Sequence, residues 1–295
     1  MAIGIVGIGN MGRPIAEYLS EVGAELVLWN RSGTKADGVA NSSIAQTPAM
    51  VVAGCDVILS VLANDTAIDH VYRGPDGLLS TELTGKTIVE MATTSPATVQ
   101  GLERDVTARG GLFLECPVSG NVVPARSGQL MGLAGGSQAA FDAAQPVLSQ
   151  ITRRLEHLGP VGTGAAMKLA VNLPLMVYWS ALGEALGLAL SQGVDAGLAL
   201  DILGDSSGAI GAAKKRIPPI RDMVVSGDPG SVSFTLTNAI KDMALMTDLA
   251  QAQGSPHAVI AAVLDKARIA AAGGWDTYDN SLAGLFGQTK QKEKP

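Results

Sequence analysis

Residues 2–32 read AIGIVGIGNMGRPIAEYLSEVGAELVLWNRS, and this stretch decides the fold. A short apolar run passes into a glycine turn, a helical pattern follows, and a second apolar run ends the stretch. This order predicts a βαβ unit. Gly7, Gly9 and Gly12 stand between the first run and the helix with the spacing G-x-G-x-x-G. The sequence therefore places a candidate phosphate-binding turn at a helix amino terminus.

Each glycine of this turn has a separate physical task. Gly7 permits the tight turn, Gly9 lets a dinucleotide pyrophosphate approach the backbone, and Gly12 allows the helix to pack closely on the strand. The helix amino terminus favours the negative phosphates. A glycine turn that binds no ligand is the alternative, and the strand–turn–helix setting argues against it.

The end of the second strand indicates which dinucleotide binds. NAD sites normally place an acidic residue here, about 20 positions after the glycine turn, to bind the ribose hydroxyls. In this chain the strand 25–29 is followed by Asn30, Arg31 and Ser32. A guanidinium can pair with a 2′-phosphate and a hydroxyl can donate to it, whereas a carboxylate would repel it. NADP(H) is the expected cofactor; the alternative is that Arg31 and Lys35 are solvated loop charges.

The alternation of strands and helices continues beyond this unit. Short apolar runs at 56–62, 87–91 and 112–115 are separated by helical segments. Strands that alternate with helices predict a parallel, doubly wound sheet of the Rossmann type. After about residue 160 only long apolar patterns at helical spacing remain, so the second half is expected to be all α.

The predicted fold class is therefore α/β, with two domains joined by a long helix. We expect a Rossmann domain over residues 1–162 and an all-α substrate and dimerisation domain over residues 163–295. The segment GPVGTG, residues 159–164, is interpreted as the flexible backbone of the junction.

Composition limits the function classes. A net charge of −6 across 295 residues argues against a nucleic-acid surface, which needs clustered Lys and Arg. Cys55 and Cys116 form no CxxC pair, and no histidines stand at metal-ligand spacing, so we expect reduced core cysteines and no metal. The amino terminus lacks a basic region followed by an apolar run, which makes cytoplasmic residence the expectation.

The most apolar stretch, residues 169–190, raises the question of a membrane. Lys168, Asn172, Pro174 and Glu184 interrupt or flank it. We therefore expect a buried helix between domains or subunits and no membrane span. Because this helix is too apolar for a solvated surface, it also predicts a homodimer or homotetramer.

Five motifs in order resemble the β-hydroxyacid dehydrogenase family, which includes 3-hydroxyisobutyrate dehydrogenase, tartronate semialdehyde reductase and glyoxylate/succinic semialdehyde reductase. The resemblance covers nearly the whole chain. It implies a Rossmann domain joined through a long helix to an all-α domain, with the active site in the cleft and a dimeric or tetrameric assembly. The motifs are IGIVGIGNMGRPIAEYL (3–19), EMATTSP (90–96), CPVSGNVVPARSGQLMGLAGG (116–136), GPVGTGAAMKLAVN (159–172) and FTLTNAIKDMALM (234–246).

The resemblance also implies roles for individual residues. The family's catalytic lysine corresponds to Lys168, and its asparagine to Asn172, four residues later and so on the same helix face. Ser119 and Gly120 match the family's P-V-S-G segment, which binds the substrate carboxylate. Asn121 stands where the family often has glycine and adds an amide near the substrate. Position 171 is valine rather than a second asparagine, which looks most like the glyoxylate/succinic semialdehyde reductase branch.

Further carried-over residues complete the expected site. Phe234 and Asp242 are expected at the substrate and Lys241 at the cofactor, the alternative being a solvated Lys–Asp pair on a helix face. Thr93 is expected beside the nicotinamide, next to Ala92 where relatives usually have serine. The full set of expected cofactor-binding residues is Gly7, Gly9, Asn10, Met11, Gly12, Asn30, Arg31, Ser32, Leu62, Thr93 and Lys241.

The chemistry of hydride transfer agrees with these roles. Reducing a carbonyl requires a proton for the developing alkoxide, and an ammonium in a desolvated site can supply it because burial lowers its pKa toward working pH. Lys168 would also stabilise the negative oxygen. Taken alone, a lysine in an apolar helix is more often a snorkelling surface residue.

Three functions remain in competition. The leading one is NADPH-dependent reduction of a short aldehyde- or keto-acid, or the reverse oxidation of a 3-hydroxy acid, with Lys168 as general acid/base. The second is imine reduction, although imine reductases typically carry Asp or Tyr at the position of Lys168. The third is a non-catalytic dinucleotide-binding module, which the presence of Lys168 and Asn172 disfavours.

Overall fold

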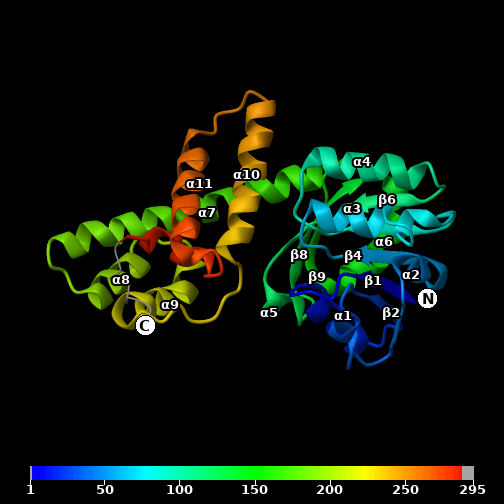
Figure 1. Ribbon diagram of the computed structural model, residues 1–295, viewed down its shortest axis with the longest axis horizontal. Helices are drawn as coiled ribbons and strands as arrows, with labels where there is room; N and C mark the ends of the chain where they lie inside the picture. Colours follow the sequence, from blue (N-terminus) through cyan, green and yellow to red (C-terminus); the bar gives the residue numbers. More distant parts are fainter. Residues whose placement is uncertain (1, 288–295) are drawn as a thin grey trace. The chain divides into compact units, whose positions relative to one another are not determined.

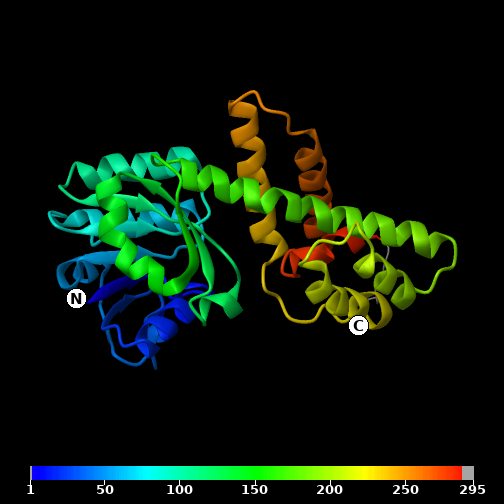
Figure 2. The ribbon, with the colours of Figure 1, turned by 180° about the vertical axis from the view of Figure 1, so that it is seen from behind.

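The structure is a computed structural model in which residues 2–287 are described. The chain divides into two compact units, Met1–Leu169 and Ala170–Pro295. The long helix α7, Thr163–Ser191, begins in the first unit and continues into the second. Figures 1 and 2 show the course of the chain from opposite sides.

The first unit is built on a nine-stranded sheet. Its strand order is β3-β2-β1-β4-β5-β6-β8-β7, and β9 pairs with β8. The strands from β3 to β6 run parallel, whereas β8 is antiparallel to both β6 and β7. The strands are β1 (Ile3–Val6), β2 (Leu26–Trp29), β3 (Ser42–Ile44), β4 (Val57–Ser60), β5 (Thr87–Glu90), β6 (Leu112–Glu115), β7 (Val118–Ser119), β8 (Leu130–Gly136) and β9 (Thr152–His157).

Helices cover both faces of this sheet, as a doubly wound fold requires. One apolar core joins the sheet to α1 and α6, and a second joins the other face to α2, α3 and α4. Figure 1 shows α3 and α4 in front of the sheet, and Figure 2 shows α6 on the opposite side. The helices of this unit are α1 (Gly12–Glu21), α2 (Pro48–Gly54), α3 (Asp65–Arg73), α4 (Pro96–Thr107), α5 (Val122–Ala125) and α6 (Gln138–Ile151), with short 3-10 turns η1 (Gly33–Ala36) and η2 (Leu78–Ser80).

The central strands of the sheet are buried, as their apolar sequences predicted. Strands β1, β4 and β5 are buried along their full length because each has parallel neighbours on both sides and helices on both faces. The Rossmann prediction is confirmed. The extension of the sheet through β7, β8 and β9, in which β8 is antiparallel to β6 and β7 and parallel to β9, was not predicted.

The second unit is helical apart from one isolated bridge, Thr235 to Asp279, in its described part. Helices α10 and α11 lie side by side, as both ribbon views show. Helix α7 approaches the turn η4 backbone to backbone, because a Cβ on Gly183 would overlap Gly284. The remaining elements are α8 (Ala196–Asp205), α9 (Ala213–Ser226), α10 (Leu236–Ala252), α11 (Ala258–Ala270), the π turn η3 (Ala271–Trp275) and the 3-10 turn η4 (Asn280–Leu285).

Helix α7 was predicted from its apolar sequence and is confirmed. By length and composition alone it is the one described helix that could cross a membrane, and 33% of its most apolar window is buried within the structure. Core helices of globular proteins meet the same length and composition criteria, so this property does not by itself indicate a membrane.

Candidate active site

The glycine turn after β1 has the geometry that the sequence predicted. Gly7 adopts φ +98°, and a side chain there would overlap the carbonyl oxygen of Val61. A side chain on Gly12 would overlap the carbonyl oxygen of Gly7. At Gly9, in contrast, an added Cβ would meet no atom within 4 Å. The first and third glycines are thus required by the fold, whereas Gly9 leaves open the space in which a pyrophosphate would approach.

Helix α1 offers its amino terminus to a ligand. Its N-cap, Met11, makes no side-chain capping hydrogen bond. The neighbouring helices of the same unit are capped by their own side chains, namely Thr47 on α2, Asn64 on α3, Ser95 on α4, Asn121 on α5 and Ser137 on α6. In this first turn the Arg13 N–H donates to the Gly9 carbonyl oxygen at 3.0 Å and Pro14 has no N–H, so the helix start attracts an anion through its dipole and through the open space at Gly9. The residues present therefore fit a dinucleotide phosphate at α1.

The end of β2 is tied directly to the glycine turn. The Asn30 side chain accepts a hydrogen bond from the Ile8 N–H at 2.9 Å and donates to the Ser32 carbonyl at 3.0 Å. Arg31 and Ser32 are exposed, and no acidic residue stands among residues 30–32. This arrangement suits a cofactor that carries an additional phosphate on its ribose.

The loop after β5 carries Thr93 and is held by a buried carboxyl group. Glu90 is fully buried; its Oε2 accepts from Ser60 at 2.7 Å and Tyr72 at 2.9 Å, and its Oε1 accepts from the Ala92 N–H at 2.8 Å. Burial raises the pKa of Glu90 to about 7, although these hydrogen bonds act to lower it. Thr93, one residue beyond this anchor, is half-buried.

Leu62, after β4, is also brought to the glycine turn. Its Cδ2 atom would lie 3.0 Å from a Cβ placed on Gly7. Strands β4 and β1 pair in parallel, so the residues that follow both strands meet at one edge of the sheet. Leu62 therefore lies beside the glycine turn, and its contact with a cofactor stays a prediction.

The expected carboxylate-binding segment forms the end of β7. Ser119 is half-buried, and Gly120 has φ +136°. A side chain at 120 would come within 2.7 Å of Leu130 and 3.0 Å of Pro124, so glycine is required there. Asn121 uses its side-chain oxygen to accept from the Val123 N–H at 3.1 Å, which caps α5. The amide that the sequence placed near the substrate thus has a structural hydrogen bond as well.

Lys168 lies in the first part of α7 and is 8% exposed. The alternative interpretation, a lysine snorkelling to the surface, predicts a more exposed residue than this. Asn172 follows four residues later on the same helix face. A buried ammonium and an amide in this order can both act on one oxygen atom.

In the second unit, Asn172 belongs to a polar cluster with α10. Its Nδ2 donates to Asp242 Oδ2 at 3.1 Å, and the Lys241 ammonium lies 3.1 Å from Asp242 Oδ1. Asp242 is 1% exposed, which excludes the alternative of a solvated Lys–Asp pair. The carboxylate orients the Asn172 amide from a residue 70 positions away.

Phe234 precedes α10 and is fixed by Asp279 rather than by the Asn172 cluster. Asp279 Oδ2 accepts from the N–H groups of Ser233 at 2.8 Å and Phe234 at 3.2 Å. Burial alone would raise the pKa of Asp279, but the hydrogen bonds from Ser233 and Ser281 and the nearby Arg216 outweigh it and lower that pKa.

The two cysteines are free and buried, as predicted. Burial raises the pKa of Cys116 to about 12 and that of Cys55 to about 11, so neither thiol ionises near neutral pH. A thiolate nucleophile beside Glu115 is therefore excluded. Within residues 2–287, no group of three His, Cys, Asp or Glu side chains could hold a metal ion.

Comparisons with known proteins agree with this geometry. Residues 2–159 match the NAD-binding domain model of 6-phosphogluconate dehydrogenase, and residues 162–283 match the NAD-binding model of NADP-dependent 3-hydroxyisobutyrate dehydrogenase. Glyoxylate/succinic semialdehyde reductase 2 of Arabidopsis thaliana is 31% identical over 95% of this chain and 78% of its own. Mitochondrial 3-hydroxyisobutyrate dehydrogenase of Homo sapiens is 31% identical over 86% of this chain and 77% of its own.

The chain belongs to the β-hydroxyacid dehydrogenase family. Its members named above have the same identity to it, so the comparison does not separate the semialdehyde reductase branch from the 3-hydroxyisobutyrate dehydrogenases. As a β-hydroxyacid dehydrogenase, the chain is an oxidoreductase that uses a nicotinamide dinucleotide.

Solved structures share the fold. A 3-hydroxyisobutyrate dehydrogenase from Salmonella typhimurium aligns with a TM-score of 0.85 at 24% identity, covering 96% of this chain and 98% of the other. An imine reductase from Myxococcus stipitatus in complex with NADP+ aligns with a TM-score of 0.65 at 18% identity, covering 97% and 99%. At these identities the likeness shows the fold alone.

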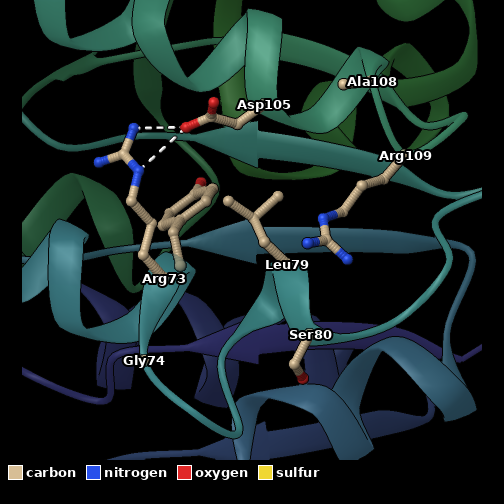
Figure 3. A pocket seen from close by; sticks show the side chains of 8 residues that line it. Arg73, Gly74, Leu79, Ser80, Asp105, Ala108 and Arg109 are labelled. Atoms are coloured by element: carbon tan, nitrogen blue, oxygen red, sulfur yellow. Dashed lines mark hydrogen bonds and ion pairs between the residues drawn. The ribbon is translucent and has the colours of Figure 1, made fainter.

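This β-hydroxyacid dehydrogenase also has a surface hollow of about 410 Å³ in its first unit, shown in Figure 3. Arg73 closes one side through two hydrogen bonds to Asp105, and Arg109 lies on the other. Tyr72 lines it, but the Tyr72 hydroxyl donates to Glu90 in the core. None of the residues predicted for the active site lines this hollow.

Sequence reasoning missed the residues that hold the site in place. Glu90, Glu115 and Asp279 are buried acids whose partners lie in other elements. A signal was available for two of them, because Glu90 and Glu115 each end an apolar strand, and a buried acid must find hydrogen-bond donors.

Proposed function

We propose that this β-hydroxyacid dehydrogenase is an NADPH-dependent reductase of short aldehyde- or keto-acids, of the glyoxylate or succinic semialdehyde type. The observation that carries the proposal is Lys168, buried to 8% exposure and followed on the same helix face by Asn172. The same site could run the reverse oxidation of a 3-hydroxy acid, because the catalytic groups of one direction serve the other.

The first unit would hold NADPH through the glycine turn, the start of α1, Arg31 and Ser32. When bound, the cofactor supplies the hydride. Arg31 would pair with the 2′-phosphate, and no acidic residue stands among residues 30–32 to repel it. The preference for NADPH rests on these two features.

The chain's own residues would supply binding and proton transfer. Ser119 would donate its hydroxyl, and Gly120 its N–H, to the substrate carboxylate. The Lys168 ammonium would stabilise negative charge on the carbonyl oxygen and deliver a proton from Nζ to it. Asn172, oriented by Asp242, would donate to the same oxygen. The enzyme's contribution is therefore orientation and one correctly placed proton.

The test is the steady-state turnover of Lys168→Ala with NADPH and a panel of short oxo acids. We expect kcat to fall about 100- to 10,000-fold, the range for loss of a general acid. Lys266→Ala is the matched control, because it also removes a lysine beside α7, one that pairs with Glu184 at 3.0 Å. Turnover of Lys168→Ala close to that of the control would remove Lys168 from the mechanism.

Imine reduction is the alternative, and turnover of a cyclic imine beside succinic semialdehyde decides between them. The imine reductase likeness concerns fold, and no observation of the site favours that activity. Tight binding of NADPH with turnover of neither compound would instead favour a non-catalytic module.

We also propose that the protein assembles as a homodimer through its second unit and acts in the cytoplasm. Leu188 of α7 is 75% exposed, and Leu198 and Ile202, one turn apart on α8, are 55% and 58% exposed. Large exposed apolar side chains of this kind indicate an interface. Analytical ultracentrifugation at micromolar concentration tests the assembly, and a monomer contradicts it.

A further inference from the structure

Glu115, at the end of β6, is a buried acid to which the proposed mechanism gives no task. Its Oε1 accepts from the N–H groups of Gly162 at 2.5 Å and Gly164 at 2.9 Å, and its Oε2 accepts from the Ala165 N–H at 3.0 Å. These donors belong to the first turn of α7 and the residue before it. Glu115 therefore caps the amino terminus of α7. Helices α2 to α6 are capped by a Thr, Asn or Ser directly before the helix, whereas Glu115 is about 50 residues away in the sequence.

The contact is built tightly from both sides. A Cβ on Gly164 would overlap the carbonyl oxygen of Leu133 and lie 3.2 Å from Glu115 Cδ. A Cβ on Gly135, which pairs with Glu115 across β6 and β8, would overlap Glu115 Oε1. Side chains at these positions would displace the carboxylate or the helix. The segment 159–164, expected to be flexible, is thus held by hydrogen bonds and close packing.

The clamp lies one helical turn from the proposed proton donor. Lys168 stands four residues after Gly164, so the two share a face of α7 and are separated by about 6 Å along its axis. On the other side, Glu115 is followed after three residues by Ser119, the proposed carboxylate-binding residue. Through these hydrogen bonds Glu115 links the strand that leads to Ser119 with the helix that carries Lys168.

We propose that Glu115 is a positioning residue that fixes Lys168 relative to Ser119 by clamping the first turn of α7 to β6. The proposal rests on the proposed function, in which Lys168 delivers the proton. Because both carboxylate oxygens accept hydrogen bonds, a Gln side chain cannot replace Glu115; its amide nitrogen would face an N–H donor. The start of the helix, and Lys168 with it, would shift.

Burial and hydrogen bonding act in opposite directions on the ionisation of Glu115. Burial raises the pKa of Glu115 to about 7, the three backbone N–H groups act to lower it, and the negative charge of Glu103 acts to raise it. Without the three donors, burial would favour the neutral acid, which has only one oxygen free of a proton.

A double-mutant cycle tests whether Glu115 acts through Lys168. We expect Glu115→Gln to lower kcat about 10- to 100-fold, the scale for a misplaced catalytic group, with the Kd for NADPH changed less than about 2-fold. In the Lys168→Ala background the same substitution should change kcat less than about 2-fold, because the group that Glu115 positions is gone. Losses that multiply in the double variant would overturn the proposal.

A second measurement does not depend on turnover. Hydrogen exchange followed by mass spectrometry should show faster exchange of the amides of residues 163–168 in Glu115→Gln, by at least about 10-fold, with exchange in α2 unchanged. Thr47→Ala, which removes the cap of α2, is the matched control and should show the reverse pattern with kcat unchanged. Unchanged exchange at the start of α7 would overturn the clamp.

The kinetic cycle and the hydrogen-exchange measurement distinguish a failure of the clamp from a failure of the proposed function. If the wild-type enzyme turned over no short oxo acid, the proposed function would fail, while exchange at α7 would still decide the clamp. If Glu115→Gln does not fold, Glu115→Asp replaces it, because it keeps the charge but shortens the side chain. We expect the same double-mutant cycle for this variant, with a smaller loss of kcat. Equal kcat values for Glu115→Asp and wild type would overturn the positioning role.

Discussion

Substituting two glycines of the turn, Gly9 and Gly12, one at a time separates cofactor binding from folding. Gly9 does not have positive φ, and an added Cβ would meet no protein atom within 4 Å. Gly9→Ala should therefore change the free energy of unfolding by no more than about 1 kcal/mol. Gly12→Ala would overlap the Gly7 carbonyl oxygen, so the helix must move, at a cost of about 3 kcal/mol or more.

In contrast to its small effect on stability, Gly9→Ala should weaken cofactor binding markedly. Its methyl group would occupy the space into which the pyrophosphate comes, and overpacking of about 1–3 kcal/mol corresponds to a Kd for NADPH raised about 5- to 150-fold. Isothermal titration calorimetry and chemical denaturation measure the two quantities on the same preparation. A folded Gly9→Ala protein that binds NADPH as tightly as wild type would refute the assignment of this turn.

Three further substitutions test other parts of the site. Arg31→Ala should raise the Kd for NADPH about 10- to 100-fold and leave that for NADH within about 2-fold, because only the former has the 2′-phosphate; equal losses for both cofactors would contradict this. Burial gives Glu90 a folded-state pKa of about 7, above its ordinary value of 4.5, so its stabilising contribution is complete below pH 4.5 and is lost as pH rises through 7. Glu90→Gln should remove this part of the pH dependence of unfolding, at most on the order of 3 kcal/mol, and identical slopes in urea titrations between pH 5 and 8 would contradict it. Asp279→Ala removes the acceptor of the Phe234 N–H and should raise KM for the oxo acid while the Kd for NADPH stays unchanged. A raised Kd for NADPH with KM unchanged would contradict this role.

The parts of the fold that the sequence predicted are those with a strong local pattern. Strands β1, β2, β4, β5 and β6 are short apolar runs, and α7 is a long one. Strand β8, LMGLAGG, contains three glycines, and β9, TRRLEH, is largely polar, so neither has the composition typical of a strand. They form because β6 and α6 supply neighbours from elsewhere in the chain, which no local pattern shows.

The same distinction applies to the site. The glycine turn and the Lys168–Asn172 pair are defined by spacing within a few residues, so they could be identified directly. The Asn172–Asp242 bond and the Glu115 clamp join residues 47 to 70 positions apart, and only the folded backbone brings them together. At these positions the sequence shows a polar residue among apolar neighbours, but it does not show which residue is its hydrogen-bond partner.

The double use of Asn30 has a consequence for attempts to redesign the cofactor preference. An Asp at this position would keep the acceptor for the Ile8 N–H but lose the donor to the Ser32 carbonyl, and would place a carboxylate next to Arg31. Substituting Asn30 to change ribose recognition would thus also remove the hydrogen bond that holds the chain on either side of Arg31. A switch toward NADH therefore calls for a library that varies positions 30, 31 and 32 jointly, since a change at Asn30 alone also removes its hydrogen bond to the Ser32 carbonyl.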